Sequence, residues 1–206
     1  MWRLLYPLRY FTLINREKRA LDLLALPLAL LVAAPFWVLR TANFFAGSGF
    51  LEKLLALLSA LAGFFVAALV AAATFAHPDL DKVITSGPVY ERRGSGADRH
   101  DEALSRRQLT CMIFGYLAFI CLVMSLLAAI VVTTAAPLKA LLQTLDIGKY
   151  ILGQPWPWIR AILIYLISLP LAHIFVVTGL GLYYLIDRLH AKEPQVLAKK
   201  PDRKAA

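Results

Sequence analysis

Four long apolar stretches dominate this sequence, and they limit the folds available to it more than any other feature. They cover residues 23–39, 54–75, 109–132 and 159–185. At a rise of about 1.5 Å per residue, a helix of about 20 residues crosses a hydrocarbon core roughly 30 Å thick. Backbone amides find no water inside a bilayer, so such segments fold as helices. The pattern predicts an all-α, polytopic membrane protein with four transmembrane helices.

The Lys and Arg residues predict how these helices are oriented. Of the 22, 17 lie before the first stretch, between the second and third, or after the fourth. Loops that face the cytoplasm are enriched in Lys and Arg. We therefore expect both termini and the central loop of a multi-pass membrane protein to be cytoplasmic. The net charge of +9 is then explained by contact with anionic lipid, and direct nucleic-acid binding is not expected.

The same pattern divides the chain into parts. Residues 1–22 predict an interfacial segment on the inner leaflet, 23–185 a transmembrane domain with a cytoplasmic loop at 76–107, and 186–206 a basic cytoplasmic tail. Between residues 137 and 157, four leucines recur at helical spacing, namely Leu138, Leu141, Leu142 and Leu145. That spacing predicts a short amphipathic helix on the periplasmic surface.

Nothing in the sequence favours an enzyme or a cofactor-binding protein. Both cysteines, Cys111 and Cys121, lie inside the third apolar stretch, and the helices leave no length for a soluble catalytic domain. The His and Asp residues of the central loop lack the spacing of a metal site. We expect no catalytic residue, no metal and no cofactor.

Small residues line one side of the second predicted helix. Ser59, Gly63, Ala67 and Ala71 are four apart, with Leu58 on the opposite side. Small side chains let two backbones approach closely, which holds helices together in lipid. The pattern predicts a packing face, either within one chain or between the chains of a homo-oligomer.

His173 lies near the midpoint of the fourth apolar stretch. Ionisable residues inside a membrane usually face the protein interior and are candidates for function. A neutral imidazole can also be satisfied by one hydroxyl or carbonyl, and Pro170 frees a carbonyl nearby. His173 is therefore either a packed polar residue or part of a gating, proton or ion site.

Two basic pairs flank the flexible centre of the cytoplasmic loop. Arg92 and Arg93 precede a Gly- and Ser-rich stretch, and Arg106 and Arg107 open the third apolar stretch. We expect them to contact anionic lipid or an acidic partner. Ser105 and Gln108 have the spacing of a capping box and predict a helix start.

Two patches carry a resemblance to a known family. One is the run at 63–75 followed by Asp79 and Asp81; the other combines 104–109 with 114–119. Together they resemble the small transmembrane effectors associated with bacterial retron antiphage defence systems. The resemblance implies a membrane-perturbing effector of the abortive-infection type. Its expected cytoplasmic partner would be a reverse transcriptase or nucleic-acid-binding protein that contacts loop 76–107.

Two other functions fit the sequence. One is a non-catalytic membrane subunit that anchors or assembles a cytoplasmic complex. The other is a small channel or transporter, although no inverted repeat of broken helices is visible in the sequence.

The charge pattern makes a direct prediction about topology. Reporter fusions after Arg99 and after Lys200 should read as cytoplasmic, and a fusion after Gly148 should read as periplasmic. A periplasmic reading at Arg99 would contradict the whole arrangement.

Overall fold

The computed structural model describes residues 2–14, 16–39, 42–45, 48–74, 80–83, 89–93, 100–144 and 156–190. These residues are mainly helical. The four long helices are α1 (Arg16–Val38), α2 (Phe50–Thr74), α3 (Arg106–Thr144) and α5 (Trp156–His190). Each is long and apolar enough to cross a membrane, which confirms the four predicted helices.

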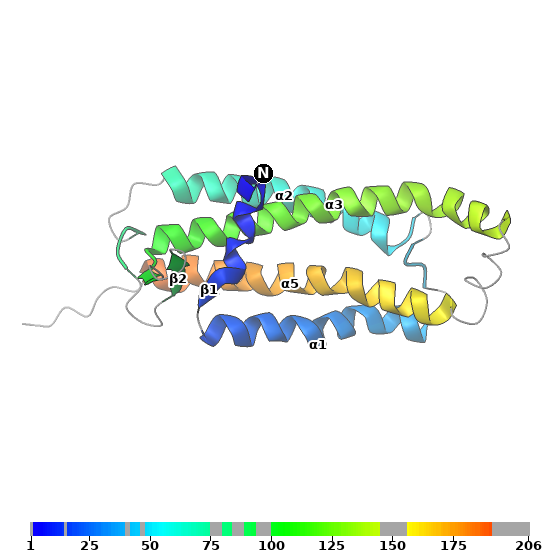
Figure 1. Cartoon of the computed structure of the whole chain (residues 1–206), viewed down its shortest axis with the longest axis horizontal. Helices are drawn as coiled ribbons and strands as arrows, with labels where there is room; N and C mark the ends of the chain where they lie inside the picture. The colour runs from blue at the N-terminus through cyan, green and yellow to red at the C-terminus, as the bar shows by residue number, and fades with distance from the viewer. Residues whose placement is uncertain are drawn as a thin grey trace, which may run out of the picture.

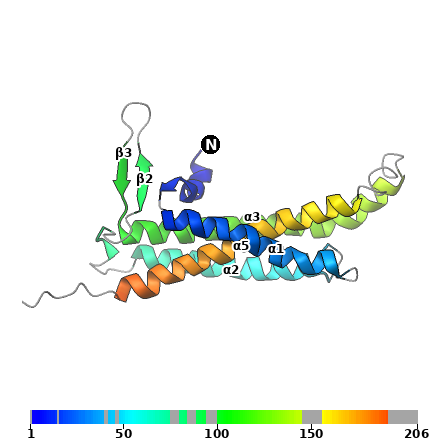
Figure 2. The same cartoon turned by 90° about the horizontal axis from the view of Figure 1, so that it is seen from below.

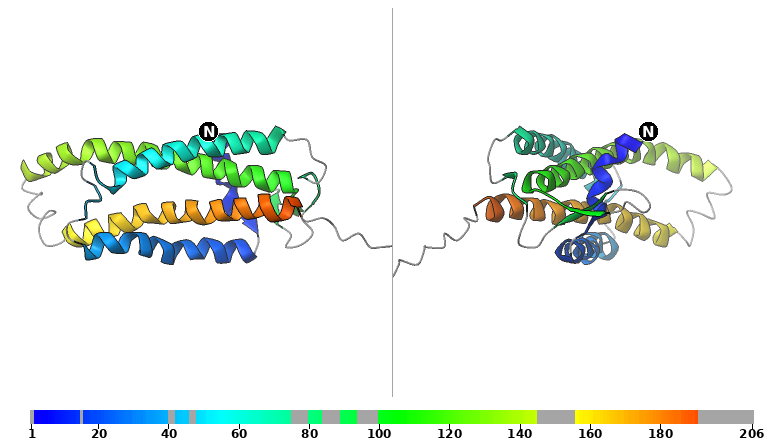
Figure 3. Two further views of the ribbon diagram at one scale, coloured as in Figure 1. Left: turned by 180° about the vertical axis from the view of Figure 1, so that it is seen from behind. Right: turned by 60° about the vertical axis from the view of Figure 1, so that its left-hand side comes forward.

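The helices form two antiparallel pairs that lie side by side (Figures 1 and 3). α1 packs against α5, α2 packs against α3, and contacts between α3 and α5 join the pairs. The α2–α3 seam consists of large apolar side chains at spacings of three and four residues. On α2 these are Leu51, Leu54, Leu58 and Phe65, with Ala62, and on α3 the ring of Phe114 lies 6.2 Å from that of Phe65. This spacing is that of two helices that bury one stripe each.

The α1–α5 seam is made of small side chains. Ala25 and Ala29 on α1 are buried against Ala172 on α5, and Leu28 and Val176 pack around them. Ala33 continues the same spacing of four residues and is also fully buried. The close backbone approach that small residues allow in lipid is thus found between α1 and α5.

The predicted small-residue face of α2 does not pack within the chain. Ser59, Gly63, Ala67 and Ala71 are all exposed, and a Cβ built on Gly63 meets nothing within 4 Å. Leu58, predicted to be on the less important side, is fully buried. Packing within one chain was therefore the wrong interpretation of this face, because α3 packs on the leucine side. Packing between chains stays a prediction.

A short 3-10 helix and a small sheet accompany the four helices. η1 (Trp2–Thr12) crosses the bundle outside its long helices (Figure 2). It leads into β1 (Leu13–Ile14), which pairs antiparallel with β2 (Tyr90–Arg93), and β2 pairs antiparallel with β3 (His100–Ala103). The described residues are mostly helical, as predicted, but the prediction of an all-α chain missed this sheet, because its strands are too short to show an alternating pattern.

Several predicted boundaries also move. α1 begins at Arg16, so residues 16–22 belong to the first long helix. α3 runs through Pro137 to Thr144, so residues 137–144 extend this helix and do not form a separate one. Proline is tolerated in such helices, as Pro27, Pro35 and Pro170 also show. The rest of the predicted amphipathic segment, 145–155, and the tail at 191–206 lie outside the described residues.

The two seams predict opposite effects for similar substitutions. Ala29→Leu should force α1 and α5 apart and cost about 1–3 kcal/mol of unfolding free energy. Ala67→Leu, on the exposed face of α2, should cost far less in the monomer. Unfolding of the protein reconstituted in bicelles measures both, and equal losses would contradict the assignment of the seams.

Candidate functional site

A cluster of four polar side chains lies inside the bundle, at the point where η1 crosses it. Lys18 and Asp22 come from α1, His173 from α5 and Tyr116 from α3. Lys18 Nζ lies 2.7 Å from Asp22 Oδ2, with Lys18 nearly buried and the Asp22 side chain 23% exposed. His173 Nε2 lies 3.1 Å from Asp22 Oδ1, and the His173 side chain is 12% exposed. Three helices thus meet in one hydrogen-bonded group.

The partners of His173 fix the roles of its two ring nitrogens. The ionised Asp22 carboxylate can only accept, so Nε2 carries a hydrogen and donates to it. In a neutral ring Nδ1 then accepts, and the Tyr116 hydroxyl, 2.7 Å away, donates to it. A hydroxyl group is therefore a hydrogen-bond partner of His173, as one of the two expected alternatives predicted. The carbonyl freed by Pro170 is not needed as a partner of the imidazole.

Two aromatic residues of η1 cover the cluster. Tyr10 is buried, and its hydroxyl donates to Asp22 Oδ1 at 3.3 Å. The Tyr10 ring stacks on the Tyr116 ring, with centroids 4.7 Å apart, and Lys18 Nζ lies 4.3 Å from the centroid of the Tyr10 ring. Phe11 stacks on the His173 imidazole, with ring centroids 5.6 Å apart. The N-terminal segment thus closes over an ionisable group in the bundle.

Sequence reasoning found only one member of this cluster. It treated Asp22 as the last residue of an interfacial segment, and only the start of α1 at Arg16 brings Asp22 inside the helix. The Lys18–Asp22 spacing of four residues was an available signal, since such pairs face each other on a helix. No local pattern could have shown that Tyr10, Tyr116 and His173 meet.

The small sheet is directly connected to the cluster. β1 follows Tyr10 and Phe11 after a single residue and precedes α1, which carries Lys18 and Asp22. β1 pairs with β2 through Leu13↔Glu91 and Ile14↔Tyr90. A displacement of β2 would therefore pull on β1, and through it on η1, which covers the cluster, and on α1, which carries Lys18 and Asp22.

The predicted basic pairs have different environments. Arg107 donates to Asp81 at 2.8 and 3.1 Å and to the Ala73 carbonyl at 3.2 Å, so it caps the last turn of α2. Hydrogen bonds from Arg107 hold the pKa of the Asp81 carboxyl below its usual value. This pairing is complete at neutral pH and is lost on acidification below that lowered pKa. Arg107 is thus engaged within the chain, whereas lipid or partner contact was expected.

The other loop residues add less to the site. Arg92 and Arg93 form the end of β2, opposite Asp101 and His100 of β3, and their side chains lie outside the described set. Arg106 donates its backbone N–H to the Lys82 carbonyl.

The predicted capping box at the start of α3 is confirmed. The backbone N–H of Ser105 donates to Gln108 Oε1, and the backbone N–H of Gln108 donates to Ser105 Oγ.

No group of three metal-ligating side chains occurs among the described residues, and His77 and Asp79 of the predicted loop lie outside them.

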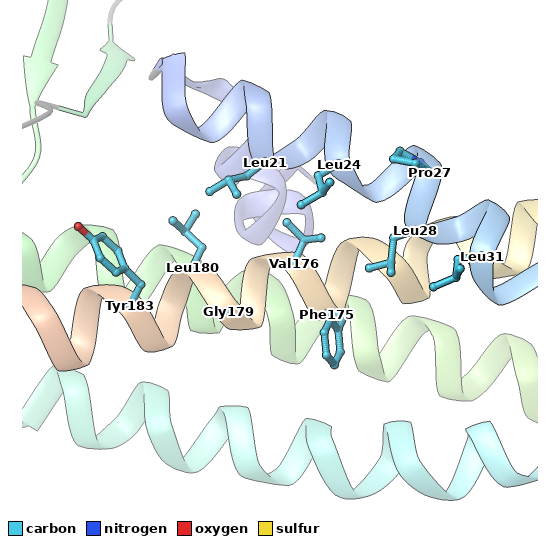
Figure 4. A pocket seen from close by; sticks show the side chains of 10 residues that line it. All are labelled: Leu21, Leu24, Pro27, Leu28, Leu31, Phe175, Val176, Gly179, Leu180 and Tyr183. Carbon is cyan, nitrogen blue, oxygen red and sulfur yellow. The ribbon is translucent and has the colours of Figure 1, made fainter.

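An apolar groove of about 710 Å³ runs between α1 and α5 beside the cluster (Figure 4). Leu21, Leu24 and Leu28 line it from α1, and Val176 and Leu180 from α5. Gly179 leaves its floor open, since a Cβ there meets nothing within 4 Å. The lining of the groove is apolar apart from the side chain of Tyr183.

Comparison with protein-family models, with curated proteins and with solved structures found no match to this chain. The candidate site is therefore defined by its own geometry.

Removal of the shared carboxylate should weaken the fold. Asp22→Asn leaves Lys18 nearly buried without its counter-charge and should lower the free energy of unfolding by about 2 kcal/mol or more. Asp81→Asn is the matched control, since that ion pair is exposed to water and should matter much less. Unfolding in bicelles at neutral pH compares the two, and equal effects would argue against a special role for the cluster.

Proposed function

We propose that this chain is the membrane-perturbing effector of an antiphage defence system in the bacterial inner membrane. The single observation that carries the proposal is the β1–β2 pairing, which joins the cytoplasmic loop to the cluster inside the bundle. An effector needs a part that receives a signal and a membrane part that responds to it. Here the two are linked through two residues of β1.

The membrane part has the composition that this role requires. Its four helices are apolar over a length that spans a bilayer, and they present large apolar side chains outwards, such as Leu31, Phe64 and Phe175. The expected orientation puts the loop and both termini in the cytoplasm. The defence context is supported only by the resemblance to retron-associated effectors.

The unpacked face of α2 supports an assembly of several chains. A helix face of small residues that no helix of the same chain covers is suited to close contact with another copy. In this proposal, a partner bound to the cytoplasmic loop restrains assembly, and its release permits the oligomer to damage the membrane.

The half-buried Asp22–His173 pair favours a second candidate function, a small channel or transporter. Ionisable pairs inside a bundle often mark ion or proton pathways. The two functions overlap if the effector acts by dissipating the membrane potential. A non-catalytic anchor subunit would need neither this pair nor its connection to the loop.

Expression tests the proposal. Unrestrained expression should depolarise cells and stop growth, as measured with a potential-sensitive dye, and neighbouring genes should restrain this effect until phage infection. Normal growth and potential under all these conditions, with the protein present in the membrane, would leave the anchor function instead.

The β1–β2 pairing gives a sharper variant. The carbonyl of Val89 accepts from the backbone N–H of Leu104, so the polar backbone groups of Val89 face β3. The backbone groups of successive residues in a strand face opposite sides, so the N–H of Tyr90 points towards β1. Tyr90→Pro removes that donor, whereas Tyr90→Ala keeps it. At an equal amount of protein in the membrane, the toxicity of Tyr90→Pro should therefore no longer depend on the neighbouring genes. The toxicity of Tyr90→Ala should still depend on them. Identical behaviour of the two variants would contradict the coupling.

A further inference from the structure

The hydrogen bonds around His173 are complete only while its ring is neutral. Nε2 donates to Asp22, and Nδ1 accepts from Tyr116. Among the side chains that the structure describes, the charges also balance in this state, because Lys18 pairs with Asp22 at 2.7 Å. Tyr10 of η1 is a further titratable group at this pair, and its hydroxyl donates to Asp22.

A second proton on His173 would disturb this arrangement. Nδ1 would become a donor, so the Tyr116 hydroxyl would have to turn from donor to acceptor and find a new acceptor for its own hydrogen. The cluster would also gain one uncompensated positive charge in a site of low exposure, which is unfavourable without water. Stacking of Phe11 on the ring offsets part of this cost, because an aromatic face attracts a cation. Phe11 itself is 55% exposed, so that contact is the weaker of the two effects.

Water can reach the ring most directly by movement of η1. Tyr10 and Phe11 are the side chains that η1 places on the cluster, and both come from an 11-residue 3-10 helix interrupted by Pro7. Helices of this type are poorly stable on their own, so η1 depends on its contacts with the bundle. It is therefore the element around the cluster that can leave with the least loss of structure.

We propose that Lys18, Asp22, Tyr116 and His173 form a proton-binding site, and that protonation of His173 loosens η1 from the bundle. Histidine is the side chain whose charge ordinarily changes between pH 5 and 8, so acidification of the cytoplasm is the expected stimulus. Because β1 continues from η1, the same event loosens the β1–β2 pairing. This inference concerns the bundle alone and does not depend on the proposed toxicity.

Hydrogen–deuterium exchange of the full chain in lipid nanodiscs tests the proposal. Protection of the Trp2–Ile14 amides, corrected for intrinsic exchange, should fall as the pH is lowered from 7.5 to 5.5. One proton linked to the opening gives a change of up to about tenfold per pH unit. Protection of the α2–α3 seam at Leu58 and Leu117 should stay constant and so report an intact bundle.

Three variants assign the effect. His173→Asn offers a donor and an acceptor without titrating, so protection of η1 should no longer depend on pH. Lys18→Gln removes the positive charge beside Asp22, so a protonated His173 would itself neutralise that carboxylate. Acidification should then retain or increase the protection of the η1 amides. His100→Asn, in β3 and away from the cluster, is the matched control and should respond like the unmodified protein.

Two results would overturn the proposal. One is constant protection of η1 across this pH range in the unmodified protein. The other is an acid response that survives in folded His173→Asn or in Lys18→Gln, or that disappears with His100→Asn. If His173→Asn fails to fold, Lys18→Gln decides alone, since the proposal predicts that it loses the acid loosening while folding at neutral pH.

Discussion

The arrangement of this bundle depends most on the hydrogen bonds that the carboxylate of Asp22 accepts. It accepts from Lys18 within α1, from Tyr10 of η1 and from His173 of α5. Through His173 it is also linked to Tyr116 of α3. A charge in an apolar environment is stable only with its counter-charge and hydrogen bonds in place, so these four elements must meet at one point.

The apolar seams are less specific, because lipid tails are as apolar as leucine. In a membrane, helix association relies on close packing, and the two pairs reach it in different ways. α1 and α5 approach through alanines, whereas α2 and α3 interlock larger side chains. The polar cluster then fixes η1, α1, α3 and α5 in one register, while α2 is held mainly by α3 and by the cap from Arg107.

The position of β1 gives this architecture its functional interest. The two residues of β1 lie on the short segment between the cover of the cluster and the helix that carries its carboxylate, and they pair with β2. A partner that binds the β2–β3 pair and a proton that binds His173 would act on this same segment. The effector proposal and the proton-binding proposal thus involve the same segment but are tested by different measurements.

The sequence by itself determined that there are four apolar helices long enough to cross a bilayer, because a chain in lipid must satisfy its backbone within helices. It also determined the helix start at Ser105, since a capping box is a local interaction between residues three apart. It identified His173 as exceptional from composition alone.

Only the tertiary structure decided which faces pack and which polar groups meet. Small residues on α1 and on α2 have the same spacing, and the choice between them depends on the partner helix, which no local pattern encodes. The sheet was missed because its strands are short, and because β1 pairs with a segment about 80 residues away. Asp22 and His173 are 151 residues apart, and their contact exists only because α1 and α5 pack antiparallel.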